Sequence, residues 1–176
     1  AELTQAIVNK IVDLALVEGD GTNGFKSIDK ETDGKKIKKI TTKAKSAGKT
    51  PFADAIEEAV DFVRPTAGRR YLIVKAEDRK ALLDELRQAT ANAHVRIKND
   101  DTEIASEVGV DEIIVYTGSK ALKPTVLVDQ KYHIDMQDLT KVDAFEWKTN
   151  SNMILVETLT SGHVETLNAG AVITVA

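Results

Sequence analysis

The chain has 176 residues, a formal net charge of −4 and no cysteine, and 30% of its residues are charged. The missing cysteines exclude disulfide scaffolds, thiolate metal centres and cysteine nucleophiles. The acidic balance excludes the global basic excess typical of nucleic-acid-binding domains, and no apolar run approaches the roughly 18 residues of a membrane-spanning helix. The length suits one domain or two small intertwined lobes.

A first helix is predicted over residues 3–18, because apolar side chains recur there at helical spacing, at Leu3, Ile7, Ile11 and Leu14. The six residues that follow, 19–24, read G-D-G-T-N-G and satisfy the dinucleotide-binding pattern G-x-G-x-x-G. That pattern needs a strand before the glycines and a helix after them, whereas here a helix comes first. We therefore expect a structural turn, with a left-handed glycine ending the helix and Asp20 or Asn23 bonding to the backbone. Its residues are Gly19, Asp20, Gly21, Thr22 and Gly24.

Residues 25–50 form a hydrophilic connection in which one strand, 37–42, is expected. Seven lysines gather there without an acidic residue between Lys35 and Ala53: Lys35, Lys36, Lys38, Lys39, Lys43, Lys45 and Lys49. One interpretation is a patch that contacts phosphates, and the other is a solvated flexible loop. The stretch has no arginine to read bases and no aromatic side chain for stacking, which favours the solvated loop.

The next elements alternate between helix and strand. A second helix is predicted from Thr50, as N-cap, and Pro51 to the stop at Pro65. A strand over 71–75, a third helix starting near Asp78, an exposed loop over 90–103 and strands over 113–117 and 125–129 follow.

The last third of the chain is strand-like over 144–149, 153–160, 163–167 and 171–175. Ser161-Gly162 fits the turn of a tight hairpin between the middle two of these strands. Mixed helices and strands followed by an antiparallel ribbon indicate an α+β fold.

No catalytic, cofactor or metal constellation is expected. The histidines His94, His133 and His163 are scattered, and although His133 and Asp135 would share a strand face, a metal site needs two more ligands. Ser161 lacks the G-x-S-x-G context of a nucleophile. The pairs Asp100-Asp101 and Asp111-Glu112 are expected in loops without an apolar pocket. Trp147, the single tryptophan, suits either an interface or a core position.

Taken in order, four stretches resemble the C-terminal portion of tailed-bacteriophage major capsid proteins with the Hong Kong 97-type fold. Residues 14–24 (L-A-L-V-E-G-D-G-T-N-G) look like the end of the family's long spine helix and the turn after it. Residues 54–86 resemble a helix–strand–helix series, and 104–118 a glycine followed by an apolar strand. Residues 152–175 look like the terminal ribbon and last strand. The family's N-terminal arm and extended loop, upstream of the spine helix, have no counterpart here.

This resemblance implies an axial domain, residues 26–140, with a central mixed sheet flanked by helices. It implies a peripheral domain made of the spine-helix end and turn, 1–25, and the antiparallel β ribbon, 141–166, while 167–176 return to the axial domain. Some relatives crosslink a loop lysine to an asparagine. No such activity is carried over to Asn150 or Asn152, because the loop is absent.

The function implied is that of a structural subunit of an icosahedral virus head, assembled in the bacterial host cytoplasm and found in the virion. Its partner would be itself, in hexamers and pentamers, with portal, scaffold and packaged DNA as further partners and no membrane or small-molecule ligand. The lysines would face DNA or a neighbouring subunit, and Trp147 an interface. The expectation is a non-enzymatic protein without cofactor.

Two alternatives stay open. One is an encapsulin-like nanocompartment shell, which shares the fold. The other is a small phosphate- or nucleotide-binding α+β domain in which G-D-G-T-N-G contacts phosphate. The chain starts Ala-Glu without a methionine, and we expect a processed or truncated product. Without the segments that overlap neighbours in the family, it should be monomeric or weakly associating.

Overall fold

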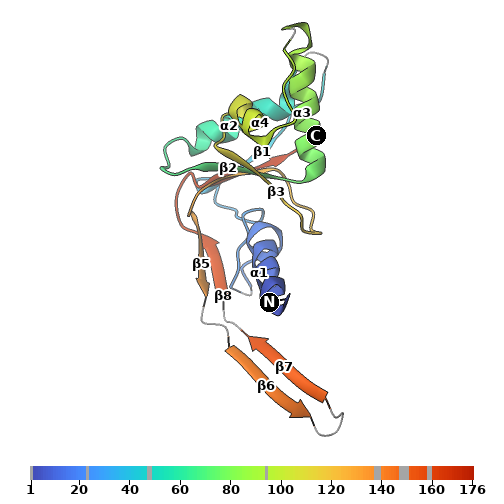
Figure 1. The fold of residues 1–176 in the computed structure, drawn as a ribbon. Coiled ribbons are helices and arrows are strands. Elements are labelled where there is room, and N and C mark those ends of the chain that lie inside the picture. Colours follow the sequence, from blue (N-terminus) through green and yellow to red (C-terminus); the bar gives the residue numbers. More distant parts are fainter. Residues whose placement is uncertain are drawn as a thin grey trace.

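A helix-covered sheet forms one end of the molecule and a narrow two-stranded ribbon forms the other (Figure 1). The structure is a computed structural model that describes residues 2–22, 24–46, 49–93, 95–136, 140–146, 151–157 and 160–176. Within these ranges, residues 92, 136, 140–146 and 151–157 are described by their backbone alone. None of the described helices is long and apolar enough to cross a membrane.

The central sheet has five strands of mixed direction. Their order across the sheet is β1 (Ile37–Thr41), β9 (Gly170–Thr174), β4 (Thr125–Val128), β2 (Arg70–Val74) and β3 (Glu112–Val115). The outer pairs β1–β9 and β2–β3 are parallel, whereas β4 is antiparallel to both of its neighbours. The last strand of the chain is thereby inserted between β1 and β4, so the sheet is complete only when the C-terminal residues are in place.

Three helices cover one face of this sheet: α2 (Pro51–Val63), α3 (Ala76–Ala89) and α4 (Asp101–Val108). Pro51 is pre-organised for the first turn of α2 and Pro65 prevents its continuation. Fully buried side chains join the two layers, among them Ile56, Leu72, Leu82, Val126 and Ile173. This cluster is the main hydrophobic core.

A second, smaller core lies on the opposite face of the sheet. It contains Ile28, Ile37, Val164, Ala169 and Val172, with Leu16, Leu127 and Tyr132 packed against it. Neighbouring residues of one strand point to opposite faces, and β9 shows this directly, since Val172 enters this core while Ala171 and Ile173 enter the main one. The segment after the first helix is therefore the second cover of the sheet.

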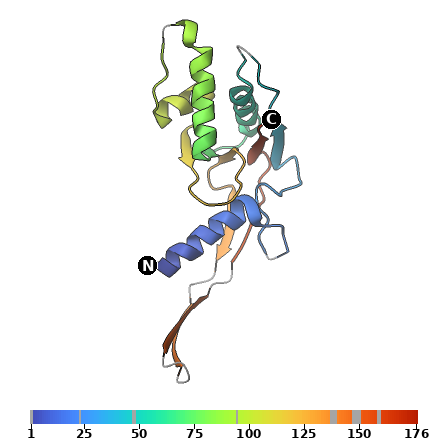
Figure 2. The same cartoon turned by 90° about the vertical axis from the view of Figure 1, so that its right-hand side faces the viewer.

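The N-terminal helix α1 (Glu2–Asp13) projects sideways from the body (Figure 2). It continues into a π-helical turn, Leu14–Glu18. None of the described residues of α1 is buried, and Leu3, Val8 and Val12 are 53%, 46% and 40% exposed. The predicted helix over 3–18 is thus present, but within the described residues its apolar stripe is only partly covered, with Ile7 and Ile11 half-buried.

The ribbon consists of two successive strand pairs. Strand β5 (Tyr132–Met136) pairs antiparallel with β8 (Thr160–Val164), and farther from the body β6 (Thr140–Glu146) pairs with β7 (Ser151–Glu157) (Figure 1). The predicted hairpin turn at Ser161-Gly162 is wrong, because both residues lie inside β8, opposite Asp135 and Ile134. Gly162 is needed there because the rings of Phe25 and Tyr132 pack closely against its backbone.

The predicted loop over 90–103 also needs correction, whereas Thr50 lies at the predicted N-cap position of α2. Residues Ala91–Ala93 form a short 3-10 helix, and α4 begins at Asp101, so Asp101 is helical and Glu112 starts β3. Helix α4 has only two turns, and its apolar positions Ile104, Ala105 and Val108 are too few for a clear periodic signal. Thr50 makes no side-chain hydrogen bond to the backbone at the start of α2.

Candidate functional site

The glycine-rich turn after the first helix is built by close approach as much as by backbone conformation. Gly19 has φ −58° and ψ 120°, so the expectation of a left-handed glycine at the helix end is wrong there. A Cβ at Gly19 would lie 2.7 Å from the carbonyl oxygens of both Leu14 and Phe25. The left-handed positions are instead Gly21 (φ 91°) and Gly24 (φ 79°), farther along the turn.

Three amides of this turn donate to acceptors of the chain itself. The N–H of Gly19 donates to the Leu14 carbonyl at 2.9 Å and that of Gly21 to the Phe25 carbonyl at 2.7 Å. The N–H of Thr22 donates to Asp20 Oδ1 at 2.9 Å, the kind of bond expected from the sequence. This bond and that of the Thr22 hydroxyl lower the pKa of Asp20. A phosphate cradle needs unoccupied N–H groups and no adjacent carboxylate, so this geometry opposes nucleotide binding.

Backbone hydrogen bonds from strand β8 connect the glycine-rich turn to the ribbon. The N–H of Gly162 donates to the Gly24 carbonyl at 3.0 Å, and the N–H of Lys26 donates to the Gly162 carbonyl at 2.9 Å. A Cβ at Gly162 would lie 2.7 Å from Cε1 of Phe25 and 2.8 Å from Cε1 of Tyr132. Gly162 was missed as a key residue because its partners lie far away in the sequence.

The structure divides the lysine cluster into two groups. Three lysines reach back to the protein: Lys36 Nζ donates to the Val164 carbonyl at 3.1 Å, Lys38 Nζ lies 2.7 Å from Glu58 Oε1, and Lys39 Nζ donates to the Ile28 carbonyl at 3.0 Å. Although Lys39 is exposed as a residue, desolvation of its ammonium lowers its pKa. The others, Lys35, Lys43, Lys45 and Lys49, are exposed.

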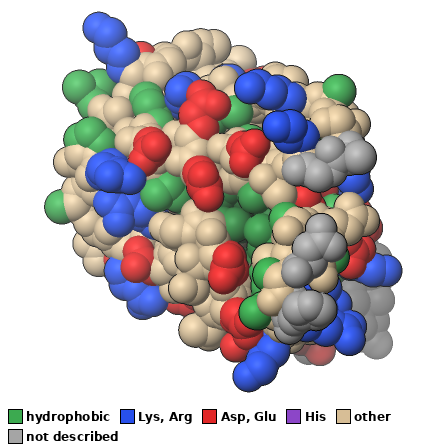
Figure 3. All heavy atoms as spheres, turned by 90° about the horizontal axis from the view of Figure 1, so that it is seen from above, with side chains coloured by type: hydrophobic (Ala, Val, Ile, Leu, Met, Phe, Trp, Pro, Cys, Tyr) green, Lys and Arg blue, Asp and Glu red, His purple; other side chains and the backbone are tan. Residues whose placement is uncertain are grey.

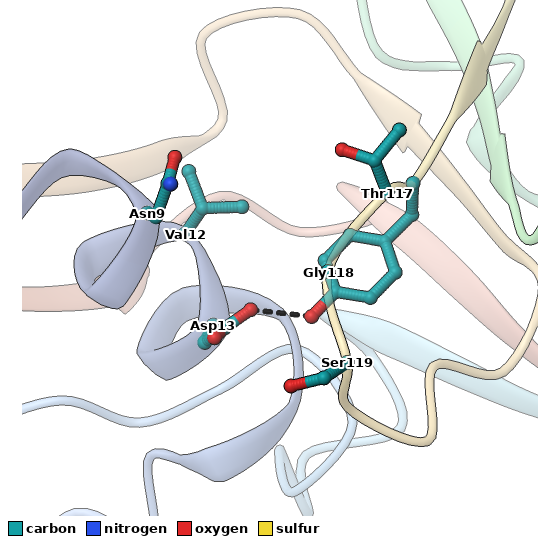
Figure 4. Close-up of a pocket in the computed structure, with 7 residues that line it drawn as sticks. Asn9, Val12, Asp13, Thr117, Gly118 and Ser119 are labelled. Carbon is teal, nitrogen blue, oxygen red and sulfur yellow. Dashed lines mark hydrogen bonds between the residues drawn. The ribbon is translucent and has the colours of Figure 1, made fainter. Parts of the chain in front are cut away.

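Polar contacts hold α1 against the loop after β3. A cleft of about 330 Å³ separates them, and the Tyr116 hydroxyl donates to Asp13 Oδ1 across it (Figure 4). Beside this cleft, Glu18 accepts from Lys10 and from Lys120, the latter at 2.6 Å. These two hydrogen bonds lower the pKa of Glu18 to about 2. Burial, followed by the bond to Asp13, raises the pKa of Tyr116.

Two buried carboxylates serve the fold. Glu85 accepts from the N–H groups of Phe52 at 3.0 Å and Ala53 at 2.9 Å, and so caps α2 from the neighbouring helix α3. Glu31 accepts from Lys26 and from the N–H groups of Thr32 and Asp33. Burial would raise the pKa of Glu31, but Lys26 and these N–H groups lower it overall. Glu31 therefore does not resemble a general acid whose pKa is raised by an apolar pocket.

The described residues form no continuous basic surface at the end of the body above α2, α3 and α4. Acidic side chains gather near the middle of this face, and lysines and arginines lie mainly around its margin (Figure 3). A DNA-binding surface carries a continuous basic stripe or patch. This face lacks that arrangement.

Among the described residues, the remaining sequence candidates assemble no catalytic centre and no metal centre of three or more ligands. Among the described ranges there is no group of three or more His, Cys, Asp or Glu side chains that could hold a metal. Asp111 accepts from the Arg70 N–H at 2.7 Å. His94, Trp147 and Asn150 lie outside the described residues, and Asn152 is described by its backbone alone.

Comparison with known proteins relates this fold to virus shells. The chain is 97% identical over 175 residues to the capsid proteins of Lactococcus phage p2 and Lactococcus phage SK1. The match covers 99% of this chain and 44% of each relative, so the chain spans less than half the length of the relatives it matches. No family model matches. The resemblance to a portion of a phage capsid protein is confirmed.

Solved structures support the same fold at low sequence identity. The chain resembles the capsid of an empty GTA particle with a TM-score of 0.59 and 14% identity, over 99% of this chain and 65% of that one. It resembles a chain of the satellite phage P4 procapsid including size determination (Sid) protein with a TM-score of 0.53 and 12% identity, over 99% and 64%. The predicted α+β class and phage capsid fold are confirmed.

Proposed function

We propose that this chain is part of a structural, non-enzymatic subunit of an icosahedral phage head, which assembles with copies of itself into the shell around the genome. The observation that carries the proposal is the 97% identity to two phage capsid proteins. The names of these relatives support a virus shell over an encapsulin-like compartment. The occupied amides of the glycine turn count against the nucleotide-binding alternative.

Two features of the chain support self-association. The apolar stripe of α1 is only partly covered within the described residues, and exposed apolar area of this kind marks interaction surfaces. The pair β6–β7 is a two-stranded ribbon that extends from the body (Figure 1), and isolated ribbons are marginally stable in water. Both elements gain cover when another subunit lies against them.

The division into domains belongs to the same proposal. An axial domain would comprise residues 26–140 with 167–176, and a peripheral domain 1–25 with 141–166. The position of β9 inside the five-stranded sheet favours returning the last residues to the axial domain. In this arrangement, Gly19 to Gly24 form the joint that redirects the chain from the N-terminal helix into the axial domain.

Portal, scaffold and DNA are further proposed partners, met during assembly in the host cytoplasm. If lysines of this chain face packaged DNA, the exposed Lys35, Lys43, Lys45 and Lys49 are the expected contacts, because the other three lysines of the cluster are engaged with groups of the chain itself. Replacing these four lysines with serine in the full-length capsid protein should leave shells intact and reduce packaged DNA. Unchanged packaging would remove DNA from the partner set.

The proposed shell function is tested by electron microscopy of the corresponding full-length capsid protein, produced with the other head proteins of the phage. Closed shells containing this protein are expected. A folded full-length protein that stays monomeric under these conditions would contradict the proposal. Size-exclusion chromatography with light scattering should find the present chain monomeric or weakly associating.

The joint is tested separately by Gly21→Val. Since no atom lies within 4 Å of a Cβ at Gly21, the cost comes from the left-handed backbone alone, about 1–2 kcal/mol. Reduced stability or defective shell formation is expected. A variant with wild-type unfolding and normal shells would show that the turn is not a structural joint.

A further inference from the structure

One face of the β5–β8 ribbon carries two histidines side by side. His133 and His163 are directly opposite in the strand register, with ring centroids 6.5 Å apart and ring planes inclined by 43°. Because side chains alternate along a strand, Asp135 and Glu165 belong to the same face. The Oε1 atom of Glu165 lies 2.8 Å from His163 Nε2. From the sequence, only His133 and Asp135 could be placed on one strand face, and the strand register adds His163 and Glu165.

Glu165 determines which ring nitrogen of His163 is available. A carboxylate oxygen can only accept a hydrogen bond, so Glu165 Oε1 is the acceptor at this contact. His163 Nε2 is then the donor, and in the neutral ring Nδ1 keeps its lone pair. A carboxylate on the distal nitrogen is the usual partner of a metal-binding histidine, because it orients the ring and raises its basicity.

We propose that His133 and His163 form a two-histidine site for a transition-metal ion such as Zn²⁺ or Ni²⁺, with water completing the coordination shell and Glu165 orienting His163. Imidazole nitrogens are ligands that suit both ions. A Zn–N bond measures about 2.0–2.1 Å, so the two rings must turn toward one another about their side-chain bonds. With two protein ligands, binding is weaker than at a four-ligand structural site.

The exposed surroundings allow these side-chain rotations, and a nearby positive charge opposes binding of the cation. The His163 side chain is 42% exposed and that of Glu165 is 63% exposed, so neither is locked in a packed core. The charged neighbour that opposes a cation is Lys36, whose Nζ is held by the Val164 carbonyl at 3.1 Å. The negative charges of Glu165 and Asp135 on the same face offset it.

A bound ion would join β5 to β8 near the body end of this strand pair, one register position from Tyr132 and Val164. A ligand that binds the folded state but not the unfolded state raises the stability of the fold by mass action. The site therefore predicts metal-dependent stabilisation of the part of the molecule that carries the outer ribbon, independently of whether the protein forms shells.

Isothermal titration of the chain with ZnCl₂ or NiCl₂ tests the site directly. We expect saturable binding of one ion per chain, a higher Tm that EDTA reverses, and no such response to MgCl₂. His133→Gln and His163→Gln should each abolish binding, and Glu165→Gln should weaken it about 10-fold. His94→Gln, which changes the remaining histidine of the sequence, is the matched control and should bind like the wild type.

The ring protons of the wild-type histidines give a second readout that does not depend on variants folding. Paramagnetic Ni²⁺ should broaden the proton signals of His133 and His163 before those of His94. Absence of saturable Zn²⁺ binding up to about 1 mM, where even a weak site would stabilise the fold measurably, would overturn the proposal. Wild-type binding by both His133→Gln and His163→Gln would overturn it as well.

Discussion

The sheet body and the N-terminal helix are stabilised in opposite ways. In the body, side chains from three helices and both faces of the sheet are buried in two hydrophobic clusters. In α1 no described residue is buried, and the helix is tied to the body through hydrogen bonds and ion pairs of Asp13 and Glu18. Burial of apolar area is the main source of folding free energy, so the body should fold by itself whereas α1 needs another surface.

This difference in burial corresponds to two properties that a shell subunit needs, a stable body and a surface for contact with its neighbours. A body with a complete core is a rigid unit that tolerates having neighbours on several sides. A helix with a partly covered apolar stripe contributes little to the stability of its own subunit, but it can bury that stripe on contact with another.

Ile173→Ala should produce the largest loss. Its side chain is 0% exposed within the main core, and removing a buried isoleucine costs about 2–5 kcal/mol of the free energy of unfolding. Leu3→Ala, at a 53% exposed position in α1, should change that free energy by less than about 0.5 kcal/mol. Urea unfolding measures both, and equal losses would remove the distinction between the two regions.

Glu85→Ala should destabilise the body through helix α2. The change leaves the N–H groups of Phe52 and Ala53 without their acceptor in a buried place, at a cost of about 1–3 kcal/mol. Glu57→Ala, on the exposed side of α2, is the control. If the two variants unfolded at the same urea concentration, Glu85 would not be a cap.

Gly162→Ala should disturb the connection between the ribbon and the body. The added methyl group would meet the rings of Phe25 and Tyr132, and overpacking of this kind costs about 1–3 kcal/mol. Gly34→Ala provides the comparison, since no atom lies within 4 Å of its Cβ position. Thermal unfolding should separate the two, and a stable Gly162→Ala would show that the ribbon shifts without cost.

The anchoring of α1 should depend on pH through Glu18. Its pKa is lowered from 4.5 to about 2 in the folded chain, so the contribution of its ion pairs is complete above pH 4.5 and is lost as the pH falls toward 2. The protection factors of the α1 amides, corrected for the intrinsic exchange rate at each pH, should therefore fall over this range. Glu18→Gln should abolish that dependence, whereas Lys98→Gln, a change at an exposed lysine, should not.

Elements defined by local residues could be predicted, and those defined by distant partners could not. Pro51 and Pro65 bracket α2 in the sequence, so the predicted helix is close to the observed Pro51–Val63. Strands β5 and β8 are separated in the sequence by the whole outer hairpin, so their pairing leaves no local signal. Ser161-Gly162 was therefore predicted as a turn although both residues lie within β8. Likewise Gly162 is required because the rings of Phe25 and Tyr132 come close, and both residues lie far from Gly162 in the sequence.

Hydrogen exchange of α1, compared between the present chain and shells of the full-length capsid protein, tests the contrast most directly. In the isolated chain, the α1 amides should exchange far faster than those of α2, because local opening is easy where few apolar contacts are made. In assembled shells they should become protected, as neighbouring subunits cover the stripe of Leu3, Val8 and Val12. An α1 protected as well as α2 in the isolated chain, or unchanged by assembly, would contradict the proposed role of this helix in the shell.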